Sequence, residues 1–484
     1  MIALADIAES LGAARPAADM PLLGVSADSR AIAPGFVFVA IPGTRADGMD
    51  YVAAAIAKGA TLIVGERAPQ DALSSASFLQ VADARAALSK IAALFYPRQP
   101  TTIAAVTGTS GKTSVAAFTR QIWAALGHQA AALGTTGVIK PSGAVSASLT
   151  TPDPVNLHRM LDELAGEGVD HLAMEASSHG LDQRRLDGVR LAVAGFTNLS
   201  RDHLDYHPTM EAYLAAKLRL FDALLEAGRP AVLNADCDVA EKVAGAIAAR
   251  SQKLCTIGRK GEFIRLLDVA ADGGDAQRIR LSHKGRLYDL RLPLAGDFMV
   301  SNALVAAAMC IVTGSDAEAV FAALETLSGA PGRLEHVGTR QGAPVFIDYA
   351  HKPDALEKVL QNLRPLARGR IIVVFGCGGD RDAGKRPIMG EIAARLADLV
   401  IVTDDNPRSE NPADIRRAIL QGAPKAIEIG DRASAIRHAV SLLQSGDVLL
   451  VAGKGHETGQ IVGAAILPFS DHEAVRAALA DAAA

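Results

Sequence analysis

Thr102-Ile-Ala-Ala-Val-Thr-Gly-Thr-Ser-Gly-Lys-Thr-Ser114 is the stretch that decides the fold. Residues 103–106 are apolar and partly β-branched, which predicts a short buried strand. A glycine turn follows, and a helical pattern then runs to about Leu126, where Gly127 ends it. Strand, turn and helix N-terminus predict an anion cradle, because glycines let backbone N–H groups approach phosphate oxygens and the helix end adds partial positive charge.

This turn predicts a nucleotide-binding loop. Lys112 would reach the β- and γ-phosphates of ATP, and the Thr113 hydroxyl would hold Mg²⁺. The usual P-loop pattern has a glycine where this chain has Val106, so the chain carries the shorter form Gly-Thr-x-Gly-Lys-Thr. A glycine-rich turn with an incidental lysine is the alternative interpretation. The predicted ATP-binding residues of the loop are Gly108, Thr109, Ser110, Gly111, Lys112, Thr113 and Ser114.

Length and charge limit the class of protein. A chain of 484 residues predicts about three domains of ordinary size. Lys and Arg total 49, Asp and Glu total 53, and this balance does not suggest a nucleic-acid partner. The four cysteines have no metal-ligand or disulfide spacing, which fits a reducing cytoplasm. The N-terminus lacks a basic signal-peptide segment, and apolar runs such as 303–312 are too short to span a bilayer. We expect a cytoplasmic monomer with no membrane partner.

The pattern of elements predicts an α/β protein of three domains. Residues 1–98 predict a small N-terminal α/β domain, residues 99–330 a central P-loop-type ATPase sheet, and residues 331–484 a Rossmann-like doubly wound sheet. In the first two domains, strands are predicted over residues 36–41, 61–64, 171–175 and 191–196, and helices near 51–58 and from 210 to about 225. In the third domain, strands are predicted over residues 345–348, 371–375, 399–403, 426–429 and 448–452.

Two polar segments follow the predicted central strands. Glu175 ends one strand, and Asn198 and His203 come after the next. Ligands of open α/β sheets bind beyond the carboxyl ends of strands, so these side chains should lie near the phosphates. The glycine-rich segment 376–381 in the third domain suggests a dinucleotide site, but it lacks the third glycine of that pattern.

Short motifs occur in a fixed order along nearly the whole chain: Asp28-Ser-Arg30, Gly108-Thr-Ser-Gly-Lys-Thr113, Thr150-Thr151, Met174-Glu-Ala-Ser-Ser-His-Gly180, Asn198-Leu-Ser-Arg-Asp-His-Leu-Asp205, Ala215-Ala-Lys217, Pro331-Gly-Arg333, Asp348-Tyr-Ala-His351, Asp405-Asn-Pro-Arg408 and Gly453-Lys-Gly-His-Glu457. In this order they resemble the Mur ligase family. The resemblance implies domains that bind a UDP-substrate, ATP and an amino acid, in that order.

The resemblance also implies a reaction in peptidoglycan precursor synthesis. ATP would phosphorylate the D-glutamyl carboxylate of UDP-N-acetylmuramoyl-L-alanyl-D-glutamate, and the amine of meso-2,6-diaminopimelate would attack the acyl phosphate. Two anions meet in the first step, so Mg²⁺ and Lys112 would have to neutralise them.

Catalytic and metal roles are implied for four side chains, Lys112, Glu175, His203 and Lys217. Mg²⁺ would be held by Thr113, Glu175, His203 and Lys217, the last as a carbamate (N6-carboxylysine). The residues alone would favour a solvated Lys217 on an alanine-rich helix. Imidazole is an unusual magnesium ligand, so His203 has the alternative role of hydrogen bonding a metal-bound water.

The resemblance assigns the remaining substrate contacts. Further ATP contacts are implied for Asn302, Arg333, Asp348 and His351. UDP-substrate contacts are implied for Ser29, Thr44, Arg45, Ala46, Thr150, Thr151, Ser177, Gln183 and Arg185. Some relatives carry asparagine where this chain has Leu149, so that contact is not expected here.

The Asp-Asn-Pro-Arg segment resembles the version that selects diaminopimelate. Its distal carboxylate invites a bidentate arginine, for which Arg408 and Arg381 are the candidates, and Glu457 could receive the distal ammonium. Lysine lacks this carboxylate and would leave a desolvated guanidinium unpaired. Capping of a surface turn is the alternative role of Arg408. The implied diaminopimelate-binding residues are Arg381, Asp405, Asn406, Pro407, Arg408, Gly453 and Glu457.

Several functions remain as alternatives. Within the ligases they are an L-lysine-adding Mur ligase, a folylpolyglutamate synthetase and the fourth-step Mur enzyme. Outside them stand a P-loop kinase, a nucleotide-dependent regulatory protein, and a structural α/β protein that merely binds ATP. Phosphate release that depends on an added amine separates the ligases from the others.

Overall fold

The computed structural model describes residues 1–13, 19–43, 46–69, 73, 75–143, 145–146, 149–273 and 275–481. Its chain divides into two compact units. The first consists of Met1–Lys112, Trp123–Thr256 and Ala308–Ser315, and the second of Thr113–Ile122, Ile257–Ala307 and Asp316–Ala484.

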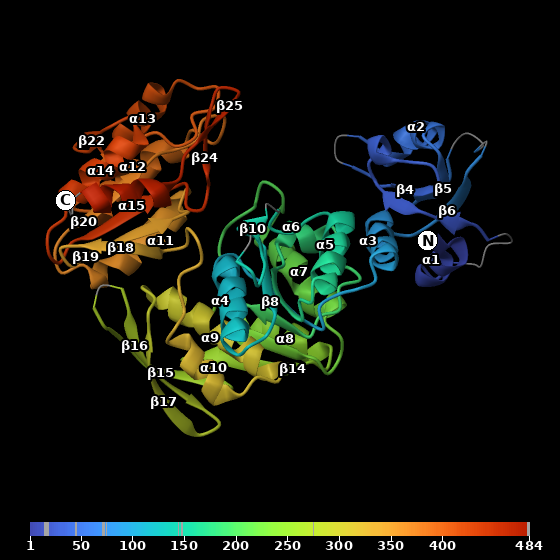
Figure 1. Cartoon of the computed structure of the whole chain (residues 1–484), viewed down its shortest axis with the longest axis horizontal. Coiled ribbons are helices and arrows are strands. Elements are labelled where there is room, and N and C mark those ends of the chain that lie inside the picture. The colour runs from blue at the N-terminus through green and yellow to red at the C-terminus, as the bar shows by residue number, and fades with distance from the viewer. Residues whose placement is uncertain are drawn as a thin grey trace. The chain divides into compact units, whose positions relative to one another are not determined.

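The first unit opens with a four-stranded parallel sheet in the order β3-β4-β5-β6 (Figure 1). Val37 and Val39 of β4 share a buried core with Leu88 and Ile91 of α3, so the amphipathic helix covers one face of the sheet. The elements are β1 (Ile2–Ala3), α1 (Leu4–Ser10), β2 (Pro21–Leu22), β3 (Gly24–Ser26), β4 (Phe36–Ala40), α2 (Val52–Ala57), β5 (Ala60–Gly65), β6 (Ser77–Gln80) and α3 (Ala84–Phe95).

The central sheet is built around β7, the strand of the deciding stretch. In the first unit its strands follow the order β10-β9-β8-β11-β7-β12-β13-β14, and β8, β11, β7, β12 and β13 run parallel. Its elements are β7 (Thr102–Thr107), α4 (Lys112–Ala125), β8 (Ala130–Gly134), β9 (Gly137–Ile139), β10 (Val145–Ser146), α5 (Pro154–Gly166), β11 (His171–Glu175), α6 (Ser178–Asp182), β12 (Val193–Phe196), α7 (Met210–Arg219), β13 (Pro230–Asn234), α8 (Ala240–Ala249) and β14 (Lys253–Gly258).

The register of this sheet brings the predicted polar groups to one edge. Glu175 lies opposite Val106, and Phe196, shortly before Asn198, lies opposite Thr107. Because the three strands are parallel, their carboxyl ends meet where the glycine turn begins. Helix α7 continues as a π-helical turn, Leu220–Leu224, rather than as the α-helix predicted to about residue 225.

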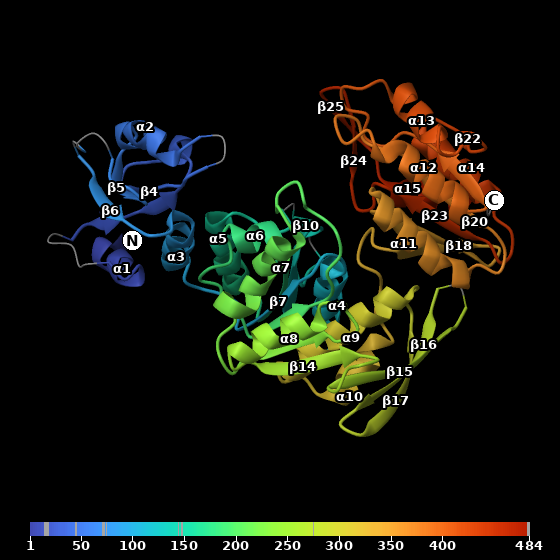
Figure 2. The same cartoon turned by 180° about the vertical axis from the view of Figure 1, so that it is seen from behind.

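The second unit contains an antiparallel meander that was not predicted. It comprises β15 (Ile264–Ala271), β16 (Gln277–His283) and β17 (Arg286–Leu292), and Figure 2 shows the strands in succession. In β16, Ile279 and Leu281 are buried and Arg278 and Arg280 are exposed. This is the alternation of a sheet with one wet face. Helices α9 (Asp297–Val312) and α10 (Ala317–Leu324) follow.

The C-terminal sheet has the order β18-β19-β23-β20-β21-β22. Five strands are parallel, as predicted, and β18 adds an antiparallel edge. Buried residues of α14 and α15, among them Ile436 and Val475, cover one face. The elements are β18 (Glu335–Arg340), β19 (Ala343–Asp348), α11 (Pro353–Leu363), β20 (Ile371–Phe375), α12 (Lys385–Leu396), β21 (Leu399–Val402), α13 (Pro412–Leu420), β22 (Ile427–Glu428), α14 (Arg432–Ser441), β23 (Val448–Ala452), β24 (Gly459–Val462), β25 (Ala465–Pro468) and α15 (Asp471–Asp481).

Among the described helices, none combines the length and the apolar character needed to cross a bilayer.

Candidate active site

The glycine turn is fixed by the segment that follows β12. The Thr109 N–H donates to the Asn198 carbonyl at 2.9 Å, and the Ser110 N–H donates to Asn198 Oδ1 at 3.0 Å. Gly108 has φ +146°, and a β-carbon there would lie 1.9 Å from Thr197 Oγ1. Only glycine fits this close approach, so the loop backbone is held in shape by its neighbour.

Two lysines converge on one carbonyl of this loop. Lys112 Nζ donates to the Gly108 and Thr109 carbonyls at 2.8 and 2.9 Å, and Lys217 Nζ donates to the Gly108 carbonyl at 2.8 Å. Lys217 is 1% exposed, and its ammonium lies over the Tyr213 ring, 4.3 Å from the ring centre. Burial and the charge of Lys112 hold the pKa of Lys217 well below its usual range, although Asp202 opposes this shift. Lys217 is therefore no solvated surface lysine.

Glu175 ends β11 as a buried carboxylate, 1% exposed. Its hydrogen-bond donors are the N–H and the hydroxyl of Thr135, at 2.7 and 3.3 Å. Gly134 makes room for the carboxyl group, because a β-carbon there would lie 2.2 Å from Glu175 Oε1. A buried carboxylate whose donors are both neutral suits a cation, so Glu175 fits the predicted magnesium ligand.

His203 lies among aromatic rings near the loop. It has φ +54°, its Nε2 lies 3.5 Å from Asp202 Oδ2, and its ring centre lies 4.8 Å from that of His179. His179 is 5.6 Å from His207 by the same measure. Burial is the main cause that lowers the pKa values of His179 and His207, so both rings favour the neutral form.

Five of the predicted UDP-substrate residues form one connected group in the first unit: Thr150, Thr151, Ser177, Gln183 and Arg185. Thr151 Oγ1 accepts from the Ser177 hydroxyl at 3.0 Å, and the Thr151 carbonyl accepts from Arg185 at 2.6 Å. Arg185 also donates to Gln183 Oε1 at 2.7 Å, and the Thr150 hydroxyl lies 2.9 Å from that of Thr135. Thr135 is also the partner of Glu175, so the group extends to the buried carboxylate.

A cleft of about 670 Å³ accompanies this group. Gln183 and Arg185 line it, together with Ser26 and Asp28, which precede Ser29 in the N-terminal sheet domain. Ser29 is half-buried in a turn, and Ala46 is exposed. Thr44 and Arg45 lie outside the described residues.

In the second unit, three of the predicted ATP residues gather around Tyr349. The Arg333 guanidinium stacks over the Tyr349 ring at 4.8 Å, and Asp348 accepts from the Leu334 and Ala350 N–H groups at 2.7 and 2.8 Å. Burial raises the pKa of Asp348 to about 6 and lowers the pKa of His351 to about 4. Thr113, Ser114 and Asn302 are buried in α4 and α9.

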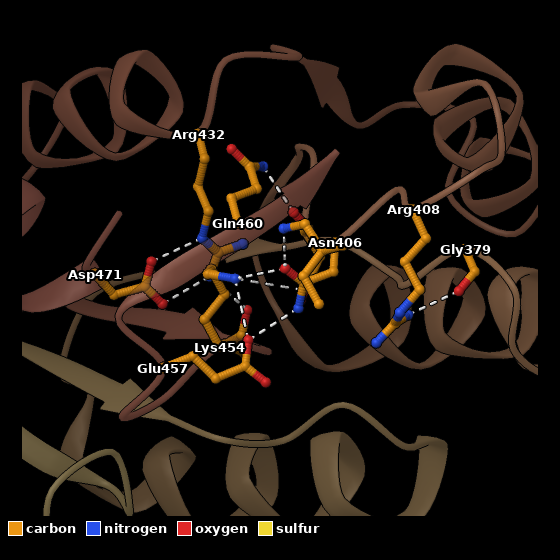
Figure 3. A network of polar contacts seen from close by, with 11 residues as sticks. Gly379, Asn406, Arg408, Arg432, Lys454, Glu457, Gln460 and Asp471 are labelled. Atoms are coloured by element: carbon orange, nitrogen blue, oxygen red, sulfur yellow. Dashed lines mark hydrogen bonds and ion pairs between the residues drawn. The ribbon is translucent and has the colours of Figure 1, made fainter. Parts of the chain in front are cut away.

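The Asp405–Arg408 segment forms a compact polar network (Figure 3). Asn406 Nδ2 donates to Glu457 Oε2 at 2.9 Å. Lys454, fully buried, donates to Asn406 Oδ1 at 3.0 Å and to Glu457 Oε2 at 3.1 Å. Gln460 Nε2 donates to the Asp405 carbonyl at 2.7 Å. The network fixes an acidic group, Glu457, beside the segment predicted to bind a diamine.

Arg408 is held in an unusual backbone conformation. Its φ is +51°, its N–H donates to the Ile461 carbonyl at 3.0 Å, and its carbonyl accepts from the Gly463 N–H at 2.7 Å. The guanidinium donates to the Gly379 carbonyl at 2.7 Å, as Figure 3 shows. Strained non-glycine residues often mark functional sites, and here the hairpin of β24 and β25 fixes the strained residue.

The glycine-rich segment 376–381 packs against this segment. A β-carbon at Gly379 would lie 1.9 Å from the Pro407 carbonyl oxygen, and one at Gly378 would lie 2.8 Å from Arg408 Nη1. Its glycines are thus explained by close packing, which removes the reason to see a dinucleotide site. The exposed Arg381 has its Cγ 3.9 Å from the same Gly378 position.

A buried ion pair lies behind the network. Arg432 and Asp471 are both fully buried and joined at 2.7 and 2.8 Å, and Arg432 also donates to the Ala452 carbonyl. Gly453 follows directly, with φ +114° and a β-carbon position 2.6 Å from Asp405 Oδ2. The ion pair therefore anchors the strand end from which Gly453 and Lys454 emerge.

Several residues of the site were missed by sequence reasoning: Thr135, Tyr213, Arg432, Lys454, Gln460 and Asp471. Lys454 lies inside the Gly453–Glu457 motif, and this position in the motif could have indicated that it belongs to the site. The others have no local signal, because burial and long-range pairing decide their roles.

Family models match this chain in three stretches. They are the Mur ligase family catalytic domain at residues 22–96, the Mur ligase middle domain at 106–310, and the Mur ligase glutamate ligase domain at 332–455.

Individual relatives match over the whole length. The chain is 60% identical over 482 residues to the UDP-N-acetylmuramoyl-L-alanyl-D-glutamate--2,6-diaminopimelate ligase of Bradyrhizobium diazoefficiens, covering 99% of both chains. A protein of the same name from Agrobacterium fabrum is 59% identical over 459 residues, which is 95% of this chain and 93% of the relative. A solved structure with that name is 32% identical, with a TM-score of 0.74 and 99% of each chain covered.

Proposed function

The chain belongs to the Mur ligase family, and on this premise we propose that it is the ATP-dependent ligase that adds meso-2,6-diaminopimelate to UDP-N-acetylmuramoyl-L-alanyl-D-glutamate. The observation that carries the proposal is 60% identity, over 99% of both chains, to a relative named for this reaction. The product would be a UDP-linked tripeptide precursor of peptidoglycan.

The first step would join ATP and the D-glutamyl carboxylate. The carboxylate oxygen would attack the γ-phosphorus, and the bond from this phosphorus to the β-phosphate oxygen would break. ADP would be the leaving group, and the D-glutamyl carboxylate would become an acyl phosphate. The loop N–H groups and Lys112 would hold the phosphates. Thr113, Glu175, His203 and Lys217 would hold Mg²⁺, which when bound offsets the negative charge of the two reacting anions.

The second step would form the amide. The neutral amine of diaminopimelate would attack the acyl carbon and lose a proton, and inorganic phosphate would leave. Arg408 and Arg381 would bind the distal carboxylate, and Asn406 and Glu457 would receive the distal ammonium. The contact of Arg408 with the Gly379 carbonyl supports this role, because a neutral partner leaves the positive charge of the guanidinium available to a carboxylate.

Lys217 would act as a carbamate. Only a neutral amine adds to CO₂, giving a carbamate anion and a proton, and burial together with Lys112 favours the neutral amine. Carbamylation would also replace repulsion from Lys112 by attraction. The environment of Lys217 thus supports the modification that the family resemblance implies.

We also propose the domain boundaries and the cellular location of the protein. We place the UDP-substrate domain at residues 1–98, the ATP domain at 99–330 and the amino-acid domain at 331–484. A cytoplasmic monomer would meet ATP and the UDP-linked substrate directly.

The proposal is tested by following phosphate release from ATP. We expect release that requires both the UDP-dipeptide and diaminopimelate, with L-lysine a poor replacement. Release that is equally fast with lysine would favour the lysine-adding ligase. Release without any amine would favour an ATPase, and phosphate transfer to a hydroxyl would favour a kinase.

A further inference from the structure

Three metal-ligating side chains meet at the other end of the central sheet. They are His128 and the neighbours Asp170 and His171, and their ligand atoms all lie within 4.8 Å of one another. His171 begins β11, whereas Glu175 ends it, so the cluster lies at the amino ends of the strands and the phosphate loop at the carboxyl ends. None of these residues belongs to the site described above.

The backbone builds this cluster on two fixed segments. After α4, the His128 N–H donates to the Trp123 carbonyl at 3.0 Å, closing the helix with Gly127 at φ +89°. The Asp170 N–H donates to the Gln129 carbonyl at 3.1 Å, which ties the two segments together. The Asp170 carbonyl accepts from the Thr102 N–H at 3.0 Å, so β7 also holds the segment.

The side chains share one carboxylate. Asp170 Oδ1 lies 2.8 Å from His171 Nδ1, and Asp170 Oδ2 lies 4.0 Å from His128 Nδ1. The centres of the two imidazole rings lie 3.9 Å apart, and the ring planes are tilted by 35°. Each ring has a nitrogen near the same carboxyl group.

We propose that His128, Asp170 and His171 bind a divalent transition-metal ion of the zinc class. Two imidazole nitrogens and a carboxylate oxygen suit zinc or nickel, whereas magnesium prefers oxygen ligands alone. Zinc–nitrogen bonds of about 2.0–2.1 Å place tetrahedral ligand atoms roughly 3.4 Å apart. This value lies between the two nitrogen–oxygen distances of the cluster, 2.8 Å for His171 and 4.0 Å for His128. His128 and Asp170 are 36% and 42% exposed, so they can close on the ion while water completes its coordination.

A further observation supports the site. The Trp123 ring is fully buried and packs edge-on against His171, 4.8 Å between centres, which limits where the imidazole can turn.

Trp123 also supplies the test, because it is the single tryptophan of the chain. Ni²⁺ is titrated into the full-length protein in excess Mg²⁺ while tryptophan fluorescence is recorded. We expect saturable quenching at one Ni²⁺ per chain, in the micromolar range, reversed by Zn²⁺ or a chelator. Quenching that saturates only above millimolar Ni²⁺, or does not saturate, would overturn the proposal.

Two variants make the test specific. His128→Gln should weaken Ni²⁺ binding at least tenfold while phosphate release stays at the wild-type rate. His336→Gln is the matched control, because it removes a histidine 3.7 Å from Asp275 but leaves the cluster intact, and it should bind Ni²⁺ normally. Unchanged binding by His128→Gln would refute the site. If that variant does not fold, Asp170→Asn is used: Zn²⁺ should raise the melting temperature of the wild type but not that of Asp170→Asn, and an equal rise in both would refute the site.

Discussion

At the scale of single residues, the site depends on charges that burial has altered. Lys112 and Lys217 donate to the same Gly108 carbonyl, and Lys217 has 1% of its surface exposed. Burial disfavours the charged form of Lys217, and repulsion from the Lys112 ammonium adds to this effect, so the pKa of Lys217 is lowered and the neutral amine is favoured. The same physical reason makes this lysine, and not an exposed one, the candidate for carbamylation.

Lys217→Ala should lower amine-dependent phosphate release by at least about 100-fold, since the carbamate proposed to hold Mg²⁺ could not form. Short carboxylic acids such as formate should restore part of the activity by occupying the vacated place. Lys242→Ala, on the exposed side of α8, is the control and should stay active. Full activity of Lys217→Ala would contradict the proposal that Lys217 acts as a carbamate.

Arg408→Ala should lower kcat/KM for diaminopimelate by roughly 10- to 100-fold, because a charge-assisted hydrogen bond contributes about 1.5–3 kcal/mol. ATP binding, measured by calorimetry, should remain. Arg395→Ala removes an exposed arginine paired with Glu357 in the same domain and should have little effect. Near-normal use of diaminopimelate by Arg408→Ala would count against the assigned pocket.

Asp348 should make stability depend on pH. Burial raises its pKa from 3.8 to about 6, so between these values the folded chain binds more protons than the unfolded chain. Acidification from pH 6 to 4 should therefore stabilise the wild type relative to Asp348→Asn, by up to about 1.4 kcal/mol per pH unit. His351 has the opposite slope, but both proteins contain it. Denaturant unfolding at several pH values measures the difference, and parallel curves would contradict the prediction.

At the scale of elements, the loops that we propose to bind substrate lie at strand ends, and close packing fixes their backbones. Gly108 fits against Thr197, and Gly379 fits against Pro407. Gly108 belongs to the loop that we assign to the phosphates of ATP. Gly379 lies against the Asp405–Arg408 segment that we assign to diaminopimelate. The elements therefore position the site through contacts that tolerate no side chain.

Gly379→Ala should displace the Asp405–Arg408 segment, because its β-carbon would lie 1.9 Å from the Pro407 carbonyl oxygen. We expect a raised KM for diaminopimelate, at least about tenfold, and a lower melting temperature, since strain of this kind typically costs about 1–3 kcal/mol. Gly384→Ala is the control, since its nearest neighbour is a flexible Asp382 oxygen at 3.2 Å. Equal KM values for the two variants would disprove the packing argument.

Sequence reasoning predicted elements well where burial was complete. The bounds of β11, β20 and β23 agree with the predicted strands, because each has a buried apolar centre between polar or glycine-containing segments. The meander β15–β17 was missed, since its exposed face carries arginines and aspartates that hide the apolar alternation. The hairpin β24–β25 was missed as well, although Gly463 between two apolar runs was a turn signal.

At the scale of the whole molecule, the family prediction is confirmed and its site remains a prediction. The family could be predicted from short motifs that occur in a fixed order along the chain, because recognising them requires no knowledge of contacts between residues. The pairing of Thr135 with Glu175, or of Lys454 with Asn406, could not be predicted, because each joins segments 40 or more residues apart. Such pairs follow from strand order, which single-sequence patterns do not encode.

The most direct measurement supplies both amines at once. Protein, ATP, Mg²⁺ and the UDP-dipeptide are incubated with equal concentrations of meso-2,6-diaminopimelate and L-lysine, and the UDP-linked products are weighed by mass spectrometry. The account predicts a single dominant product, the diaminopimelate adduct, formed together with ADP and phosphate. A dominant lysine adduct, or ATP consumption without a new amide, would contradict it.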